Sequence, residues 1–307
     1  MSFPFIDAMR ERDILRRTSR SFYLTIRLLP RGVRGDVSLA YLLARATDTI
    51  ADTSTAPPEK RAALLREARN SVGKTGIEGF DADVWARDQR APAEADLLRA
   101  LPRLWTKLPA RDETARILLI RVMDRILEGQ IFDLERFGPE APPLTPEELE
   151  RYTFLVAGSV GEFWHDLCRH RFWDYSRDNS DVMRRRARHY GQGLQLVNII
   201  RDRAMDDALG RVYLPEGEVD RAESQARAWL GEGAEYCAAL RSGRLRYATL
   251  LPALLGLRTL GVSAAQPRGT LTPAKVSRSE LRRWICRAIS VWFSASAVMP
   301  LVRAASR

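Results

Sequence analysis

Residues 35–52 read GDVSLAYLLARATDTIAD, and their apolar side chains recur at the spacing of an α-helix. These side chains form one broad stripe of period 3.6. The stripe consists of Val37, Leu39, Ala40, Leu42, Leu43, Ala46 and Ile50. Residues 112–137 repeat the pattern. Thr145 followed by Pro146, Glu147 and Glu148 is typical of a helix start, and predicts a helix through Val160.

Few segments alternate as strands do, and breaks at Pro and Gly clusters such as 138–143 are too short for a flexible linker. Neither a G-x-G-x-x-G nor a Walker pattern is present. We therefore predict one all-α domain over residues 1–307, built from about ten helices.

The composition fits a folded chain, with 45% hydrophobic and 29% charged residues in 307. The net charge is +10, and Lys60, Lys74, Lys107 and Lys275 are the only lysines among the 49 basic residues. An arginine-rich surface suits an anionic partner: nucleic acid, acidic lipid or a polyphosphate substrate.

Three features bear on the compartment. Cys168, Cys237 and Cys286 are too widely spaced for a disulfide framework or a cysteine metal site. The first residues, MSFPFIDAMRERD, lack the apolar stretch of a secretory signal. The longest uncharged run, 288–302, is shorter than the roughly 20 residues that span a bilayer. The sequence therefore predicts a cytoplasmic protein.

Acidic residues follow the apolar stripe of residues 35–52. Asp48 and Asp52 are four residues apart, which places two like charges on one helical face. A second stripe lies in QLVNIIRDRAMDD, residues 195–207, where Asn198, Asp202 and Asp206 follow one another at spacings of four. Oxygen ligands of this kind suit Mg²⁺, which takes one or two carboxylates and is completed by waters and substrate phosphates.

Arginines accompany both stripes, and their guanidinium groups can bind phosphate oxygens in a bidentate manner. Arg45 precedes Asp48, and Arg201 and Arg203 flank Asp202. Two acid stripes with adjacent arginines in an apolar helical frame predict a metal–diphosphate site.

Four motifs, in this order and spacing, resemble the squalene/phytoene synthase family. They are TSRSF at 18–22, YLLARATDTIAD at 41–52, VAGSVG at 156–161 and NIIRD at 198–202. The resemblance runs from about residue 12 to about residue 220. It implies an isoprenoid-synthase helical bundle around a central cavity. Within the family, the motifs resemble those of squalene synthases most. Members join two prenyl diphosphates head to head with Mg²⁺.

The resemblance also implies roles for individual residues. It places Mg²⁺, with Mn²⁺ as an alternative, at Asp48, Asp52, Asn198, Asp202 and Asp206. The implied substrate-binding residues are Arg20, Ser21, Arg45, Gln195 and Arg211, and the implied catalytic residues are Tyr41, Tyr152 and Arg201.

The expected reaction ionises one allylic diphosphate, forms a cyclopropane with a second, and then rearranges it. Two outcomes stay open. Hydride from NADPH would give squalene from farnesyl diphosphate, the product that the first motif favours. Proton loss would give phytoene or dehydrosqualene. The chain length of the substrate and the oligomeric state also stay open.

Met205 stands where the family's second motif, D-x-x-E-D, carries glutamate, and a thioether is no ligand for Mg²⁺. Asp207 points about 100° away from Asp206 on an ideal helix. A catalytically weak scaffold subunit of a prenyl-synthase assembly is therefore an alternative. A nucleic-acid binder would leave the acid stripes unexplained, so we expect no nucleic-acid partner.

Three other groups of residues have a simpler structural interpretation. His165 and His170 have no common ligand face with Asp166, which predicts a structural role. The arginines of residues 184–188 predict a solvated helix face. For Trp284, Trp292 and Phe293 we predict core packing, with peripheral contact to the cytoplasmic face of a membrane as the alternative.

Overall fold

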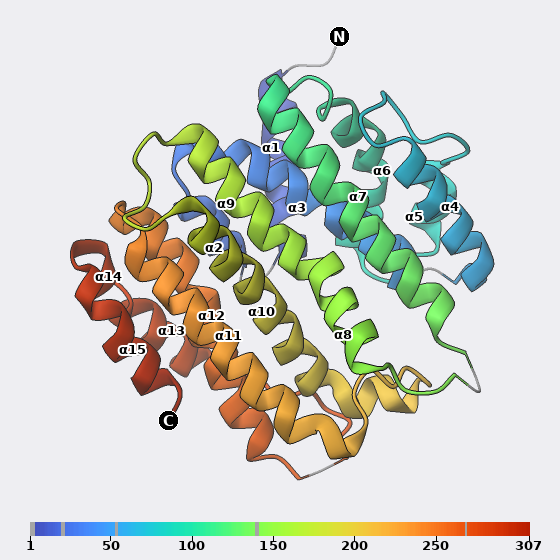
Figure 1. Ribbon diagram of the computed structural model, residues 1–307. Helices are drawn as coiled ribbons and strands as arrows, with labels where there is room; N and C mark the ends of the chain where they lie inside the picture. Colours follow the sequence, from blue (N-terminus) through green and yellow to red (C-terminus); the bar gives the residue numbers. More distant parts are fainter. Residues whose placement is uncertain (1–3, 20–21, 53–54, 139–140, 268) are drawn as a thin grey trace. The chain divides into compact units, whose positions relative to one another are not determined.

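The computed structural model describes residues 4–19, 22–52, 55–138, 141–267 and 269–307, and side chains from Glu11 onward with the exception of Phe22. The chain is 76% helical and the described residues form no strand, only an isolated bridge between Ser176 and Leu240 (Figure 1). The predicted all-α fold class is confirmed. The described residues contain fifteen α-helices. The prediction of about ten was too low, because short helices such as α5 (Ala82–Arg87) and α14 (Ser290–Phe293) have no apolar period of their own.

Contacts divide the chain into two compact units, residues 1–135 and 136–307, and each is described by itself. The single domain over 1–307 stays a prediction. Unit 1 contains α1 (Pro4–Ser19), α2 (Phe22–Leu28), α3 (Arg31–Asp52), α4 (Pro58–Asn70), α5 (Ala82–Arg87), α6 (Pro92–Thr106) and α7 (Glu113–Arg136).

Unit 1 has a core between α3 and α6, where apolar stripes of both helices are buried. Leu43 and Ile50 of α3 and Leu97, Leu101 and Trp105 of α6 have no exposed surface. The indole of Trp105 donates a hydrogen bond to the carbonyl of Ser71 at 3.1 Å, which satisfies its polar group inside the core. With the exception of Val37, which is half-buried, the apolar stripe of residues 35–52 is therefore the buried face of α3, as its spacing predicts.

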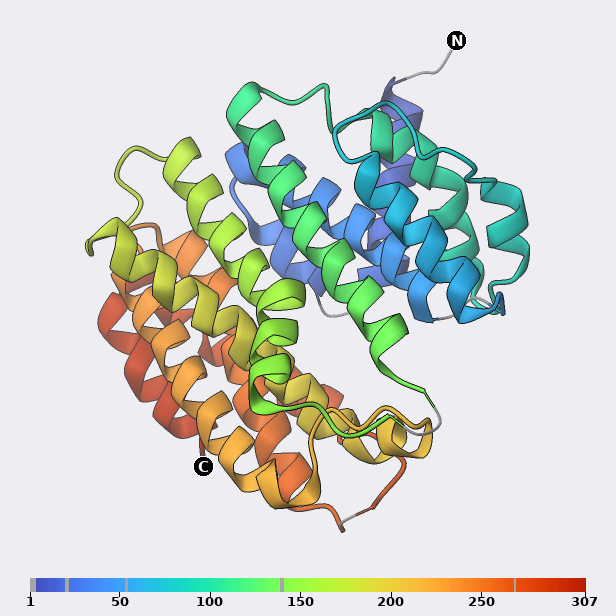
Figure 2. The same cartoon turned by 45° about the vertical axis from the view of Figure 1, so that its right-hand side comes forward.

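Unit 2 contains α8 (Pro146–Thr153), a π-helical turn (Phe154–Gly158), α9 (Ser159–Arg171), α10 (Ser180–Ala208), α11 (Val219–Ala239), α12 (Gly243–Ala264), α13 (Arg278–Arg287), α14 (Ser290–Phe293) and α15 (Val298–Ala305). Two 3₁₀ turns lie at Glu216–Glu218 and Ala295–Ala297. Helix α10 packs against α9 on one side and α11 on another, and α13–α15 pack on α12 (Figure 2).

The predicted helix start at Thr145 is confirmed, and it forms a capping box. The Thr145 hydroxyl accepts from the backbone N–H of Glu148 at 3.2 Å, and the Glu148 carboxylate accepts from that of Thr145 at 2.9 Å. The helix passes through the π-helical turn at Phe154–Gly158 and continues beyond Val160 to Arg171. Apolar spacing predicts the helix but not the extra residue in that turn.

Glycines bring the π-helical turn and α9 against α10. A Cβ on Gly161 would lie 1.9 Å from the Ala187 carbonyl oxygen, and one on Gly191 would lie 2.1 Å from that of Ala157. Only glycine permits such a backbone approach. The VAGSVG segment therefore has a packing role that fixes α8 and α9 on α10.

Helix α12 is long and apolar enough to cross a membrane by length and composition, and no other helix of the described ranges is. Within its most apolar stretch 56% is buried inside the structure. Leu250, Leu254 and Leu257 are among its buried residues, and α12 contacts α10, α11 and α15. A core helix with these contacts has the same composition as a spanning one.

Candidate active site

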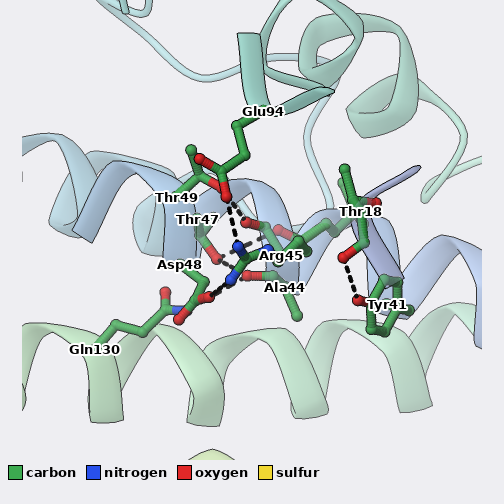
Figure 3. A network of polar contacts seen from close by, with 10 residues as sticks. Thr18, Tyr41, Ala44, Arg45, Thr47, Asp48, Thr49, Glu94 and Gln130 are labelled. Carbon is green, nitrogen blue, oxygen red and sulfur yellow. Dashed lines mark hydrogen bonds and ion pairs between the residues drawn. The ribbon is translucent and has the colours of Figure 1, made fainter. Parts of the chain in front are cut away.

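The first acid stripe lies at the end of α3 (Figure 3). Nη1 of Arg45 lies 2.5 Å from Oδ2 of Asp48, one turn further along the helix. Asp52 follows on the same stripe and is exposed. All three residues lie in unit 1 on one helix, as the spacing predicts.

Glu94 of α6 completes this group. Its Oε1 lies 2.6 Å from Nη2 of Arg45, so the guanidinium is held between two carboxylates (Figure 3). Only 17% of the Glu94 side chain is exposed. Sequence reasoning missed Glu94, because it stands in an ordinary helical pattern and no motif marks its contact with a residue 49 positions earlier.

The environment of Asp48 disfavours the ionised form of its carboxyl while Asp52 is charged. The partial burial of Asp48 raises the pKa of its carboxyl, the charge of Asp52 adds to the rise, and Arg45 opposes it. Asp133 of α7 raises it further and is an acid that sequence reasoning did not single out. A cation placed beside the pair would stabilise both ionised carboxylates.

Gln130 of α7 extends toward Asp48 (Figure 3). Its Nε2 lies 3.5 Å from the carbonyl oxygen of Ala44, while its buried Oε1 accepts no hydrogen bond from any residue that the structure describes. A buried amide oxygen without a donor is costly, and a water, a cation or a donor from a ligand would satisfy it.

Tyr41 begins the same stripe on α3. Its hydroxyl donates to the carbonyl of Thr18 at 3.2 Å, which ties α3 to the end of α1 (Figure 3). Arg20 and Ser21, predicted to bind substrate, lie outside the described residues.

The second acid stripe lies on α10 in unit 2. Asn198, Asp202 and Asp206 are each partly exposed, at the predicted spacing of four. Nε of Arg201 lies 2.8 Å from Oδ1 of Asp202, and Nη2 lies 2.5 Å from Oδ2. The amide of Asn198 donates to Oε1 of Gln195 at 3.4 Å.

The segment after α10 returns to this stripe. Nη2 of Arg211 lies 3.7 Å from Oδ1 of Asp206, and its backbone N–H donates to the Asp206 carbonyl at 2.9 Å. The ring of Tyr152, on α8, stacks on Tyr213 of this segment with centroids 5.3 Å apart. Tyr152 and Asp206 therefore both contact the segment of residues 211–213, Tyr152 through the ring of Tyr213 and Asp206 through Arg211.

Met205 and Asp207 lie on either side of Asp206. Met205 is 40% exposed, so it is no part of the core of unit 2. Burial raises the pKa of Asp207, and Nη1 of Arg203 lies 4.0 Å from its carboxylate.

Each acid stripe ends in the last turn of its helix, with Asp52 in α3 and Asp206 in α10, and neither last turn contains a basic residue. The C-terminal end of a helix carries partial negative charge, so acids there are unfavourable without a cation. Within the described ranges no three His, Cys, Asp or Glu side chains lie close enough to hold a metal ion by themselves. A carboxylate pair is nevertheless what Mg²⁺ needs when phosphates and waters complete its shell.

Two groups outside the stripes have structural contacts. His165 is buried, with Nδ1 on the Tyr175 hydroxyl and Nε2 3.2 Å from the Ser180 hydroxyl, which confirms its structural role. Arg184 and Arg188 form ion pairs with Glu162. These two are therefore bound to α9 rather than merely solvated.

The sequence matches a known protein family and several known proteins. The squalene/phytoene synthase model matches residues 15–224, and the chain belongs to this family. A bifunctional lycopene cyclase/phytoene synthase of Blakeslea trispora is 32% identical over 220 residues, 69% of this chain and 33% of that protein. A phytoene synthase of Mycobacterium tuberculosis is 30% identical over 211 residues, 68% of this chain and 57% of that protein. The matched region thus spans from a third to somewhat over half of these relatives.

Solved structures share the fold. A ligand complex of TcSQS has a TM-score of 0.76 at 21% identity, over 96% of this chain and 89% of that one. A dehydrosqualene synthase in complex with a ligand has a TM-score of 0.63 at 21% identity, over 94% and 98%. The helical squalene synthase fold expected from the motifs is confirmed.

Proposed function

We propose that this protein catalyses the magnesium-dependent head-to-head condensation of two prenyl diphosphates. The observation that supports this most is the pair of acid stripes at the ends of α3 and α10, each with an arginine bound to its first aspartate. Membership of the squalene/phytoene synthase family supports the same reaction.

The acids Asp48, Asp52, Asp202 and Asp206, with Asn198, are the proposed Mg²⁺ ligands. When bound, the metal would neutralise the diphosphate leaving group and so favour formation of an allylic cation. Arg45 and Arg201 would bind phosphate oxygens beside these acids, and Glu94 holds Arg45 in place for that contact. We assign substrate binding also to Arg20, Ser21, Gln195 and Arg211.

The remaining proposed roles belong to tyrosines. The Tyr152 hydroxyl is assigned to proton handling, and the stacked Tyr213 ring orients it. Tyr41 is assigned to the site through its contact with Thr18, two residues before Arg20.

Two products remain for this reaction. The D-T-x-x-D pattern of Asp48 and Asp52 favours squalene from two farnesyl diphosphates, with NADPH as reductant. The curated relatives named as phytoene synthases favour condensation without reduction.

Product analysis tests the proposal. The protein is incubated with farnesyl or geranylgeranyl diphosphate, with Mg²⁺ and with or without NADPH, and the hexane extract is examined by mass spectrometry. We expect a hydrocarbon from one diphosphate and none when EDTA is in excess. A folded protein that yields no hydrocarbon from either substrate contradicts the proposal and supports the scaffold subunit instead.

A further inference from the structure

The C-terminal part of unit 2 has a strongly one-sided charge. Between Tyr236 and the last residue, Glu280 is the only acid in the sequence. Its Oε1 lies 2.5 Å from Nε of Arg258, so its charge is neutralised within the protein. Among the described residues, the exposed basic side chains of this part are Arg241, which pairs with Asp174, and Lys275, Arg278, Arg282, Arg283, Arg287, Arg303 and Arg307.

One exposed stripe along α13 and α14 combines charged and apolar residues. Arg282, Cys286, Ile289 and Phe293 follow at spacings of four, three and four, which places them on one side of a helix. The backbone stays right-handed helical through the junction, with φ −65° and ψ −13° at Ala288 and φ −57° and ψ −31° at Ile289.

The stripe exposes large apolar side chains. Phe293 is 83% exposed and Ile289 48%, and Trp292, which stands beside the stripe, is 38% exposed. The predicted core packing is confirmed for Trp284, which is 4% exposed, and is wrong for Phe293. Aromatic spacing alone does not say which ring of a short amphipathic helix faces inward.

The opposite side of α13 and α14 is fixed to α12. The buried guanidinium of Arg246 donates to the Val291 carbonyl at 3.1 Å, and the Tyr247 hydroxyl donates to the Ile285 carbonyl at 3.0 Å. A Cβ on Gly243 would lie 1.8 Å from the Trp292 carbonyl oxygen. The exposed stripe is therefore held rigidly by α12.

Arginines surround the apolar residues of the stripe. Arg282, Arg283 and Arg287 are exposed, and none has a carboxylate partner among the residues that the structure describes. Arg287 lies over the ring of Trp284, 5.2 Å from its centroid. Basic and aromatic side chains together on one helix face are typical of contact with anionic lipid headgroups.

We propose that Arg282, Arg283, Arg287, Ile289, Trp292 and Phe293 form a membrane-docking face that binds an anionic bilayer. A second copy of this chain fits less well, since a symmetric contact would bring identical arginines together. A nucleic acid also fits less well, because the exposed Ile289 has no ring on which a base could stack. The inference is independent of the proposed reaction.

Vesicle co-sedimentation of the full chain tests this face. We expect binding to vesicles of phosphatidylcholine with phosphatidylglycerol and little to phosphatidylcholine alone, and we expect added salt to weaken it. Each arginine removed near such a surface should weaken partition about fivefold, so that the triple variant Arg282→Ala, Arg283→Ala, Arg287→Ala loses on the order of 100-fold. Phe293→Ser should weaken it about tenfold.

Matched control variants distinguish an effect of the docking face from an effect of the protein's net charge. Arg87→Ala, Arg90→Ala, Arg121→Ala removes three exposed charges from unit 1, and Trp173→Ala removes a ring that is 97% exposed in unit 2. Both controls should bind like the wild type. Equal losses in the two triple variants, or equal binding to both kinds of vesicle, would overturn the proposal.

Two other results would also overturn it. One is a dimer in light scattering that Phe293→Ser converts to a monomer, with vesicle binding unchanged. The other is binding of a single-stranded oligonucleotide that the Arg282, Arg283, Arg287 variant abolishes, in a protein that binds no vesicle.

Discussion

Arg45 and Arg69 each lie between one aspartate and one glutamate, in two ion-pair networks of nearly identical exposure. Arg45 pairs with Asp48 and Glu94, which are 37% and 17% exposed, and Arg69 pairs with Asp124 and Glu128, which are 38% and 17% exposed. Both networks lie in unit 1. The second network therefore offers matched controls, in which the same charge is removed at the same burial outside the proposed site.

Asp48→Asn and Asp202→Asn should each lower kcat/KM more than about 100-fold, because several kcal/mol of leaving-group stabilisation are lost. Helical circular dichroism should not change, since removing like charge does not destabilise a helix. Asp124→Asn is the control and should keep nearly full activity. Activity near the wild-type level in Asp48→Asn would contradict the metal-site assignment.

Glu94→Ala should raise KM for the prenyl diphosphate about tenfold, with a smaller change in kcat, because Arg45 loses one of its two anchors. Glu94→Gln should recover part of the loss, since the amide oxygen still accepts a hydrogen bond. Steady-state kinetics of both variants beside Glu128→Ala measures this. A Glu128→Ala variant as impaired as Glu94→Ala would indicate a general effect on unit 1.

Local sequence patterns predict the helices that carry the site, but not the contacts between them. The stripes of α3 and α10 and the capping box of α8 depend only on residues a few positions apart, so that spacing suffices. Glu94 reaches Arg45 from another helix, and Gln130 approaches Asp48 from α7, and no period in the chain records either contact. The exposure of Phe293 likewise depends on how α12 fixes α14.

Gly191→Ala should lower the free energy of unfolding by about 1–3 kcal/mol or more, because the new methyl group meets the backbone of the π-helical turn. Gly231→Ala is the control in α11, where nothing lies within 4 Å, and should raise stability by up to about 1 kcal/mol. Urea unfolding followed by circular dichroism compares them. Equal stability of the two variants would refute the close-packing role of Gly191.

His165 should make stability depend on pH. Burial lowers the pKa of His165 to about 4, and the charges of Arg169 and Arg184 contribute. The unfolded chain takes up the proton near pH 6.5 while the folded protein does not. The contribution of neutral His165 to the free energy of unfolding is therefore fully present above about pH 6.5. It falls by roughly 3 kcal/mol in all as the pH drops to about 4.

Unfolding free energies of wild type and His165→Gln between pH 4 and 7 measure this contribution. The variant is expected to be less stable at pH 7, because the Tyr175 contact is lost, but to show a shallower decline toward acid. Parallel pH profiles would exclude His165 as the source.

Met205→Glu should lower the Mg²⁺ concentration for half-maximal rate about tenfold, the effect of one added ligand. The new acid would stand three residues after Asp202 on nearly the same face of α10. Met205 is 40% exposed, so the change should leave the core of unit 2 intact. Met205→Gln is the uncharged control and should keep the wild-type midpoint.

If Met205 instead contacts a hydrocarbon tail, Met205→Glu will raise KM for the prenyl diphosphate. A magnesium titration at saturating substrate distinguishes these two roles of Met205. If Met205→Glu leaves the Mg²⁺ concentration for half-maximal rate unchanged or raises it, Met205 does not weaken the metal site.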